Sequence, residues 1–236
     1  MKFLMPIREW VESANHAING ILYAAKSERH VRYHLYAALF ILLFSFIIGV
    51  DRYEFLAIAI TVIMVILAEM INTAIEAVVD LLTDQYNKYA KIAKDVAAGS
   101  VLITAVGAFV IGYVILFPYL KHAIKHGITK QNHSMENIAL VSLIITFITV
   151  IIMKTYFGRG EPLRGGMPSG HSAVSFSIWI IVTTTTGSIM LSILVFILAT
   201  LIASSRVTSG IHRPSEVIVG ALLGSTITYS LVKLFT

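Results

Sequence analysis

Long apolar runs separated by short polar segments dominate the chain from residue 34 onward. Seven runs are long enough, or nearly so, to cross a bilayer, which takes about 20 helical residues. The first, fifth and sixth are short, and the seven runs cover residues 34–50, 54–80, 97–118, 137–153, 171–187, 189–204 and 216–235. This pattern predicts an all-α integral membrane protein with about seven transmembrane helices.

Residues 5–32 have a different pattern. Apolar side chains recur at helical spacing between Ile7 and Leu22, and charged side chains such as Glu9 and Glu12 lie between them. This arrangement predicts an amphipathic helix that lies on the membrane surface and leads into the first span. Because the charges interrupt the apolar segment that a cleavable signal needs, we expect no cleavage here.

The composition agrees with a membrane protein. Hydrophobic residues make up 57% of the 236 residues and charged residues 13%, which excludes an ordinary soluble core. The chain has no cysteine, so it has neither a disulfide nor a thiolate site. Its net charge of +5 suits basic loops against anionic headgroups, and no compact basic stripe indicates a nucleic-acid partner.

The distribution of lysine and arginine among the loops predicts the orientation. If the N-terminus is cytoplasmic, most of these residues lie in cytoplasmic segments, as the positive-inside rule requires. The polar segment 121–134 then lies outside. Pro118 favours a helix end just before it. We therefore place a domain boundary there, with three spans before it and four after it.

Five polar side chains lie on one face of the second span. Glu69 is followed by Asn72, Thr73, Glu76 and Asp80 at intervals of 3, 4, 7 and 11 residues. An ionised carboxylate on a spanning helix costs about 2.5–3.5 kcal/mol or more unless it has a partner. Two carboxylates on one face indicate a cation such as Mg²⁺, and a carboxylate that is not bound to the metal can accept a proton from an attacking hydroxyl.

The segments AEMINTAIEAVVDLL and YNKYAKIAKDVAAGSVLI closely resemble the signature of the small prokaryotic diacylglycerol kinase and undecaprenol kinase family, over about residues 10–118. SERHVRYH is similar to the E-x-N-x-R-x-H form of the undecaprenol kinase branch, with His30 in place of asparagine. For Arg32 and His34, membrane-interface anchoring and a site role remain equally open. The resemblance implies a homotrimeric, ATP- and Mg²⁺-dependent lipid kinase. It further implies that Glu69 is the catalytic base and that Glu28 and Glu76 are ligands of Mg²⁺. The residues that it implies for contacts to nucleotide and phosphate are Asn72, Lys94 and Asp95.

Two polar segments in the second half carry a different set of reactive groups: GRGEPLRGGMPSGH at 158–171 and SSRVTSGIHRPSE at 204–216. The free N–H groups where PSGH opens a helix make an anion site. His171 and His212 suit a two-step phosphoryl transfer, in which one histidine attacks phosphorus and the other protonates the departing oxygen. Glu216 lies four residues after His212 and could hold its imidazole. This chemistry requires no metal or other cofactor.

These segments resemble the three motifs of the type 2 phosphatidic acid phosphatase superfamily over about residues 136–235: a lysine followed by an R-P pair, then PSGH, then S-R-x5-H-x3-D. The resemblance implies that His212 is the nucleophile, which forms a phosphohistidine, and that His171 is the general acid. The residues that it implies for binding the phosphate are Lys154, Ser169, Gly170 and Arg206.

The second half departs from these motifs at two residues and in its number of spans. Glu161 stands where the first motif has its arginine, so Arg159, or Arg164 across a glycine pair, is expected to supply the missing charge. Glu216 replaces the usual aspartate but keeps a carboxylate. Only four spans are present, where many members of the superfamily have six. The glutamate either tunes the range of substrates or indicates lost turnover.

Together the two halves predict a kinase domain at 1–120, a linker at 121–135 and a phosphatase domain at 136–236. Two spans separate the polar loops 81–96 and 154–170, so both sites face one side of the membrane. Because ATP is cytoplasmic, we expect the N-terminus and both sites on the cytoplasmic face of a bacterial inner membrane.

The leading hypothesis is a bifunctional enzyme whose kinase acts on undecaprenol and whose phosphatase acts on undecaprenyl pyrophosphate, so that both supply undecaprenyl phosphate. One alternative is a diacylglycerol kinase fused to a phosphatidate or phosphatidylglycerophosphate phosphatase. Another is a kinase joined to an inactive, lipid-binding module. A transporter is disfavoured, since Gly220 and Gly224 fit close helix packing rather than a pore.

Overall fold

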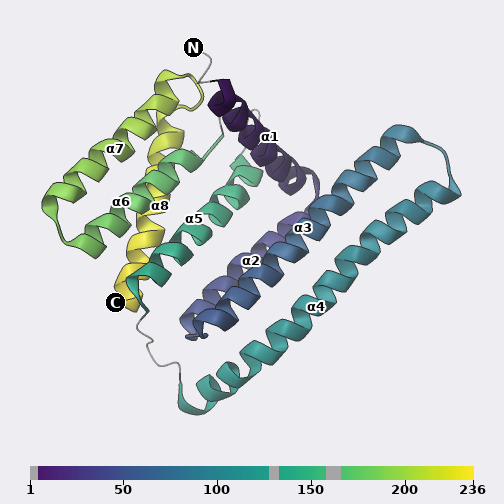
Figure 1. Ribbon diagram of the computed structural model, residues 1–236, viewed down its shortest axis with the longest axis horizontal. Helices are drawn as coiled ribbons and strands as arrows, with labels where there is room; N and C mark the ends of the chain where they lie inside the picture. The colour runs from purple at the N-terminus through teal and green to yellow at the C-terminus, as the bar shows by residue number, and fades with distance from the viewer. Residues whose placement is uncertain (1–4, 128–132, 158–165) are drawn as a thin grey trace. The chain divides into compact units, whose positions relative to one another are not determined.

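The computed structural model describes residues 5–127, 133–157 and 166–236, with the backbone alone for residues 5–12, 14 and 15. The described residues form eight α-helices and no strand (Figure 1). By their contacts they divide into two compact units, one of residues 27–131 and one of 1–26 with 132–236. The helices are α1 (Met5–Ser27), α2 (Arg29–Ile47), α3 (Arg52–Leu82), α4 (Lys88–His126), α5 (Met135–Phe157), α6 (Gly170–Thr186), α7 (Ile189–Thr208) and α8 (Pro214–Phe235).

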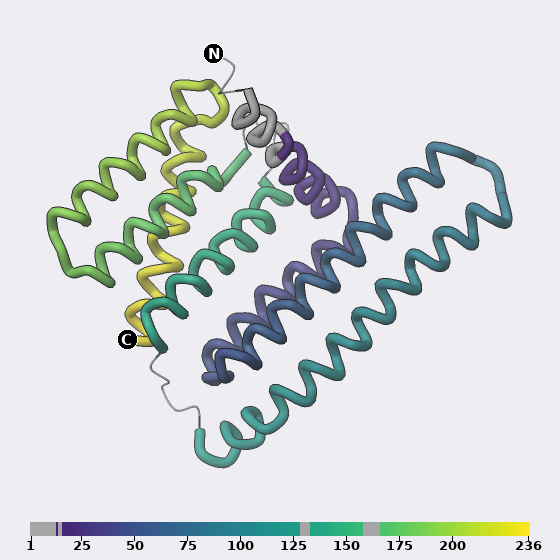
Figure 2. The backbone as a smooth tube through the Cα atoms, viewed as in Figure 1, coloured from purple at the N-terminus to yellow at the C-terminus, as the bar shows by residue number. Residues whose placement is uncertain are grey.

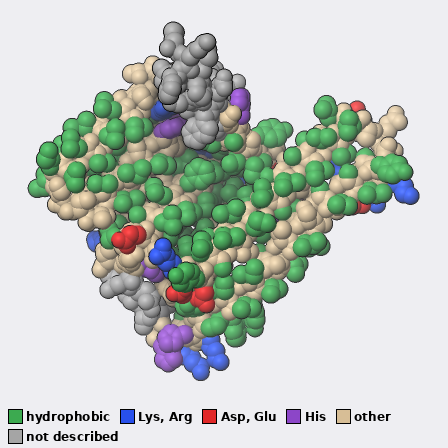
Figure 3. All heavy atoms as spheres, in the orientation of Figure 1, with side chains coloured by type: hydrophobic (Ala, Val, Ile, Leu, Met, Phe, Trp, Pro, Cys, Tyr) green, Lys and Arg blue, Asp and Glu red, His purple; other side chains and the backbone are tan. Residues whose placement is uncertain are grey.

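A helix lies at each of the seven predicted spans, and the prediction of an all-α membrane protein is confirmed. Six helices, α2 to α5, α7 and α8, are long and apolar enough to cross a membrane. The remaining one, α6, has 17 residues and is the shortest of the eight. Hydrophobic side chains cover much of the visible surface of the helices (Figure 3), as is expected of surfaces that face lipid.

The unit of residues 27–131 contains α2, α3 and α4, and Figure 2 follows the chain through them. α3 and α4 pack side by side along their lengths, and α2 packs on α3. Side-chain caps fix where the two long helices begin: Asp51 accepts from the N–H of Tyr53 at 2.9 Å, and Asn87 accepts from the N–H of Tyr89 at 2.8 Å. Each cap satisfies an N–H group that the helix itself cannot pair.

Two predicted helix boundaries are wrong. The N-terminal helix was expected to run to residue 32, but it ends at Ser27, because Glu28 has an extended backbone (φ −98°, ψ 120°) and starts the next helix. Pro118 was expected to end a helix, but α4 continues through it to His126. A proline removes one N–H donor and crowds the carbonyl four residues earlier, and long membrane helices tolerate this locally.

The second unit is organised around the contact between α6 and α8. A Cβ atom added to Gly224 would lie 1.9 Å from the carbonyl oxygen of Ala173, and one added to Gly220 would lie 2.3 Å from that of Ser169. The absence of side chains therefore lets the two backbones touch. The sequence-based expectation that these glycines serve close helix packing is confirmed. α5 packs against both helices, and α7 packs against α6.

Candidate active sites

The first candidate site begins at Glu69, in the middle of α3. Its side chain is buried, with 6% of the residue exposed. One carboxylate oxygen, Oε1, lies 3.0 Å from Nε2 of His34 on α2. A buried carboxylate needs a polar partner, because an unpaired charge in an apolar helix pair is unfavourable. His34 supplies that partner.

Further along the same face of α3, the polar side chains also meet. Asn72 donates from Nδ2 to Oε1 of Glu76 at 3.1 Å. Its own Oδ1 is buried and accepts no hydrogen bond from the described residues. Asp80 accepts from the ammonium group of Lys94 on α4. The predicted polar face of this span is therefore present, and it ends beside the start of α4.

The remaining predicted kinase residues lie near the start of α2 and on α4. Glu28 precedes α2, and its side chain makes no capping hydrogen bond. Asp95 is exposed and lies 3.9 Å from Nζ of Lys91. No three His, Asp or Glu residues among those described are arranged to hold a metal ion by themselves. The orphaned Oδ1 of Asn72 leaves a buried acceptor beside the carboxylate of Glu76, so this part of α3 can take a donor from outside the described residues.

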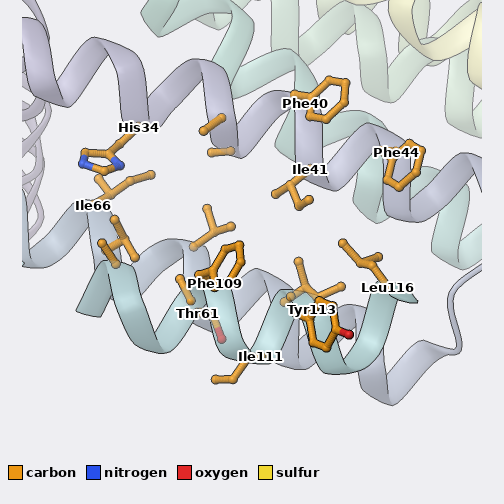
Figure 4. Close-up of a pocket in the computed structure, with 18 of the residues that line it drawn as sticks. His34, Phe40, Ile41, Phe44, Thr61, Ile66, Phe109, Ile111, Tyr113 and Leu116 are labelled. Carbon is orange, nitrogen blue, oxygen red and sulfur yellow. The ribbon is translucent and has the colours of Figure 1, made fainter. Parts of the chain in front are cut away.

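An apolar cavity of about 540 Å³ lies among α2, α3 and α4. His34 stands at one end, while Phe44 and Leu116 lie toward the other (Figure 4). Its walls are mainly aliphatic and aromatic, with Ile41 and Phe109 facing it from α2 and α4. Its volume is within the range of ligand pockets, about 300–1,000 Å³.

The second candidate site is built where α6 and α8 begin. Ser169 caps α6, with its hydroxyl accepting from the N–H of Ser172 at 3.5 Å. The N–H of Ser169 donates to the backbone oxygen of Glu216 at 2.9 Å. PSGH thus opens a helix, as predicted, and one backbone bond ties that opening to α8. The positive end of α6 makes this position favourable for an anion.

His212 lies just before α8 and is buried, with 7% of the residue exposed. Its Nδ1 lies 2.7 Å from Oε2 of Glu216. The same carboxylate accepts from the backbone N–H groups of Arg213 and Gly166, each at 3.2 Å. Burial lowers the pKa of His212 below its usual range, although the hydrogen bond to Glu216 acts in the opposite direction.

Three cationic or ionisable side chains surround this pair. Lys154, near the end of α5, is buried with 6% of the residue exposed. Arg206, near the end of α7, has a buried Nε that makes no hydrogen bond to the described residues. His171, the second residue of α6, lies within the electrostatic influence of Lys154, Arg206 and His212. The predicted groups from α5, α6 and α7 and from the start of α8 thus lie close enough to influence one another electrostatically.

Sequence reasoning did not find every residue that the structure brings to the sites. It left the role of His34 open, although that residue belongs to the SERHVRYH motif. It also missed the N–H of Gly166, because a backbone donor carries no signal in side-chain identity. The predicted charge from Arg159 or Arg164, and the unusual Glu161, lie outside the described residues.

Comparison with known proteins assigns the first and second candidate sites to two different families. Residues 15–116 match the family described as prokaryotic diacylglycerol kinase, and residues 159–236 match the PAP2 superfamily. An undecaprenol kinase from Bacillus subtilis is 37% identical over 114 residues, which are 48% of this chain and 93% of the relative. A diacylglycerol kinase from Synechocystis is 36% identical over 46% of this chain and 62% of the relative.

A diacylglycerol kinase from Escherichia coli is 27% identical over 46% of this chain and 89% of the relative. No solved structure matches the chain. The kinase relatives cover only the first half, and the PAP2 match covers most of the second. The chain belongs to the prokaryotic diacylglycerol kinase family through its first half, and its match to the PAP2 superfamily over residues 159–236 supports a lipid kinase joined to a phosphatase.

Proposed function

We propose that the first half phosphorylates undecaprenol with ATP, that the second half removes a phosphate from undecaprenyl pyrophosphate, and that both reactions supply undecaprenyl phosphate. The observation that carries the lipid assignment is the similarity to the Bacillus subtilis undecaprenol kinase over 93% of that protein's length. The second reaction follows from the first by economy: a phosphatase that acted on the kinase product would undo the kinase, whereas one that acts on the pyrophosphate makes the same product.

In the kinase half, Glu69 accepts the proton of the lipid hydroxyl while the hydroxyl oxygen attacks the terminal phosphorus of ATP. The new O–P bond forms as the bond to ADP breaks. Glu28 and Glu76 would hold Mg²⁺, which would neutralise phosphate charge. Nucleotide contacts come from Asn72, Lys94 and Asp95. For Lys94 this requires a change of partner from Asp80 to a phosphate.

In the phosphatase half, His212 attacks phosphorus through Nε2, because its Nδ1–H is engaged by Glu216. The bond between phosphorus and the leaving oxygen breaks, and His171 donates a proton to that oxygen. Water then attacks the phosphohistidine, His171 takes a proton from it, and phosphate leaves. The phosphate is bound by Lys154, Ser169, Gly170 and Arg206, with Arg159 as a further candidate.

The proposed orientation has both sites on the cytoplasmic face of a bacterial inner membrane. Two helices, α4 and α5, separate the loop after α3 from the loop before α6, so the two loops lie on one side if each helix crosses once. The family resemblance also favours a homotrimer formed through the kinase half. Because the chain has no cysteine, single cysteines can report the sidedness directly.

The topology test uses Lys125→Cys, in the last turn of α4, and Asp84→Cys, in the loop between α3 and α4, as the matched partner. An impermeant thiol reagent added to intact cells should label the first and not the second. Permeabilised cells should label both, which shows that each cysteine is reactive. Labelling of Asp84→Cys from outside would overturn the cytoplasmic placement.

The activity test offers purified protein undecaprenol and diacylglycerol with ATP and Mg²⁺, and undecaprenyl pyrophosphate and phosphatidate without them. Glu69→Gln should lower lipid phosphorylation about 10²–10⁴-fold and leave phosphate release unchanged. His212→Ala should do the reverse. A preference for diacylglycerol and phosphatidate would replace the proposed lipids, and phosphate release that is equal in wild type and His212→Ala would remove the phosphatase assignment.

A further inference from the structure

The side chain of His34 contacts the buried carboxylate of Glu69 and also lines the apolar cavity. Its Nε2 lies 3.0 Å from Oε1 of Glu69, and its ring lines the end of the 540 Å³ cavity among α2, α3 and α4 (Figure 4). Ile66, one helical turn before Glu69 on α3, lies beside it at that end. The polar pair therefore lies at one end of a mainly apolar space.

Membrane-interface anchoring does not account for this arrangement. A histidine that serves as an anchor directs its polar atoms toward headgroups or water. The polar partner of His34 is instead a carboxylate whose side chain is 7% exposed, while the side chain of His34 is itself only 28% exposed. Tyr33, next to it in sequence, is 61% exposed, as a membrane anchor would be.

We propose that His34 is a positioning residue of the kinase. Its Nε2–H donates to Oε1 of Glu69, so that the second carboxylate oxygen faces the hydroxyl of a lipid alcohol. The chain of that lipid enters the cavity beside the imidazole ring. This inference rests on the proposed kinase function. A carboxylate that rotates freely presents either oxygen in many directions. One fixed hydrogen bond selects the orientation in which proton transfer can occur.

The division of roles keeps the reaction balanced. The hydroxyl proton passes to Oε2 of Glu69, the oxygen forms its bond to the terminal phosphorus of the nucleoside triphosphate, and the diphosphate leaves. His34 neither gains nor loses a proton during this step, because its Nε2–H remains the donor to Oε1. The imidazole therefore acts through Glu69 and not on the nucleotide.

The experiment compares His34→Leu, which removes the donor, with His34→Gln, which keeps an N–H group. His122→Leu is the matched control, because His122 is an exposed histidine near the far end of α4 in the same unit. Rates are measured with a lipid alcohol in mixed micelles at varied lipid and ATP. His34→Leu should lower kcat about 10–100-fold with the KM for ATP changed less than about two-fold. His34→Gln should recover most of the rate, and His122→Leu should match wild type.

A double-mutant cycle separates positioning from a merely structural role. If His34 acts through Glu69, adding His34→Leu to Glu69→Gln should lower the rate no further. Additive losses, equal defects in His34→Leu and His34→Gln, or a raised KM for ATP at unchanged kcat would each overturn the inference. Failure of the wild type to phosphorylate any lipid alcohol would instead refute the kinase function, so the two outcomes are distinct.

Discussion

Replacing Gly224 with alanine tests the contact between α6 and α8. The added Cβ would lie 1.9 Å from the carbonyl oxygen of Ala173, 2.7 Å from its carbonyl carbon and 3.0 Å from its Cα. An ordinary C···O contact is about 3.3 Å or longer, so the two helices must separate locally by more than about 1 Å. Because the obstacle is backbone, no side-chain rotation can relieve it.

The size of the effect follows from two opposing contributions. Overpacking costs about 1–3 kcal/mol, and a backbone obstacle places this change at the upper end. Separation by even about 0.5–1 Å forfeits a quarter to a half of the dispersion attraction at the contact. Alanine favours the helix over glycine by up to about 1 kcal/mol. We expect a net loss of about 2 kcal/mol from the unfolding free energy of the second unit.

Gly107→Ala is the matched control, because a Cβ at this helical glycine of α4 would meet nothing within 4 Å. It should be neutral or stabilising by up to about 1 kcal/mol. The assay heats each purified variant in detergent and then measures residual phosphatase and kinase activity separately. Gly224→Ala should inactivate the phosphatase at a lower temperature and leave the kinase curve unchanged. Identical phosphatase curves for Gly224→Ala and wild type would refute the packing argument.

Two further changes test the polar contacts. Glu216→Gln should lower phosphatase kcat at least about 100-fold, because an amide group no longer stabilises the ring as it becomes cationic and can donate to Nδ1, which favours the wrong tautomer. The carboxylate raises the pKa of His212 against the effect of burial, so its removal should move the acid limb of the pH–rate profile to lower pH. An acid limb that moves upward would contradict this assignment. Tyr119→Phe removes the hydroxyl that donates to Glu54 at 2.6 Å and accepts from the N–H of Asp51 at 3.1 Å. Denaturant unfolding should therefore show a free energy of unfolding lower by about 1 kcal/mol for the unit of residues 27–131. Tyr113→Phe, the control, should leave that free energy unchanged.

The helices and the sites differ in how far the sequence predicts them. Hydrophobic runs locate the spans because lipid demands a long apolar helix wherever the chain crosses. The same argument fails at boundaries. Hydrophobic runs do not show that α4 continues through Pro118, because the surrounding turns decide whether the helix tolerates the missing N–H. They also do not show that the backbone becomes extended at Glu28.

For the sites, helical spacing was enough to place Glu69, Asn72 and Glu76 on one face. The pairing of His34 with Glu69 was not predictable, because it depends on how α2 packs against α3, a contact between helices joined by a turn rather than within one helix. The hydrogen bond between His212 and Glu216 was predictable, since residues four apart face each other at a helix start. The approach of Lys154 and Arg206 to this pair was not predictable, because it depends on how α5 and α7 pack in the folded unit.

The length of α6 has a consequence for how the phosphatase meets its membrane. At about 1.5 Å per residue its 17 residues rise about 25 Å, which is less than the roughly 30 Å hydrocarbon thickness of a bilayer. Either the bilayer thins beside α6 or the opening of α6 at Ser169 lies below the headgroups. In both cases, the distance from the phosphate of a lipid to this helix start depends on membrane thickness. We therefore expect phosphatase activity to depend on the acyl-chain length of the surrounding lipids. The two long helices of the kinase half, with 31 and 39 residues, are not limited in this way.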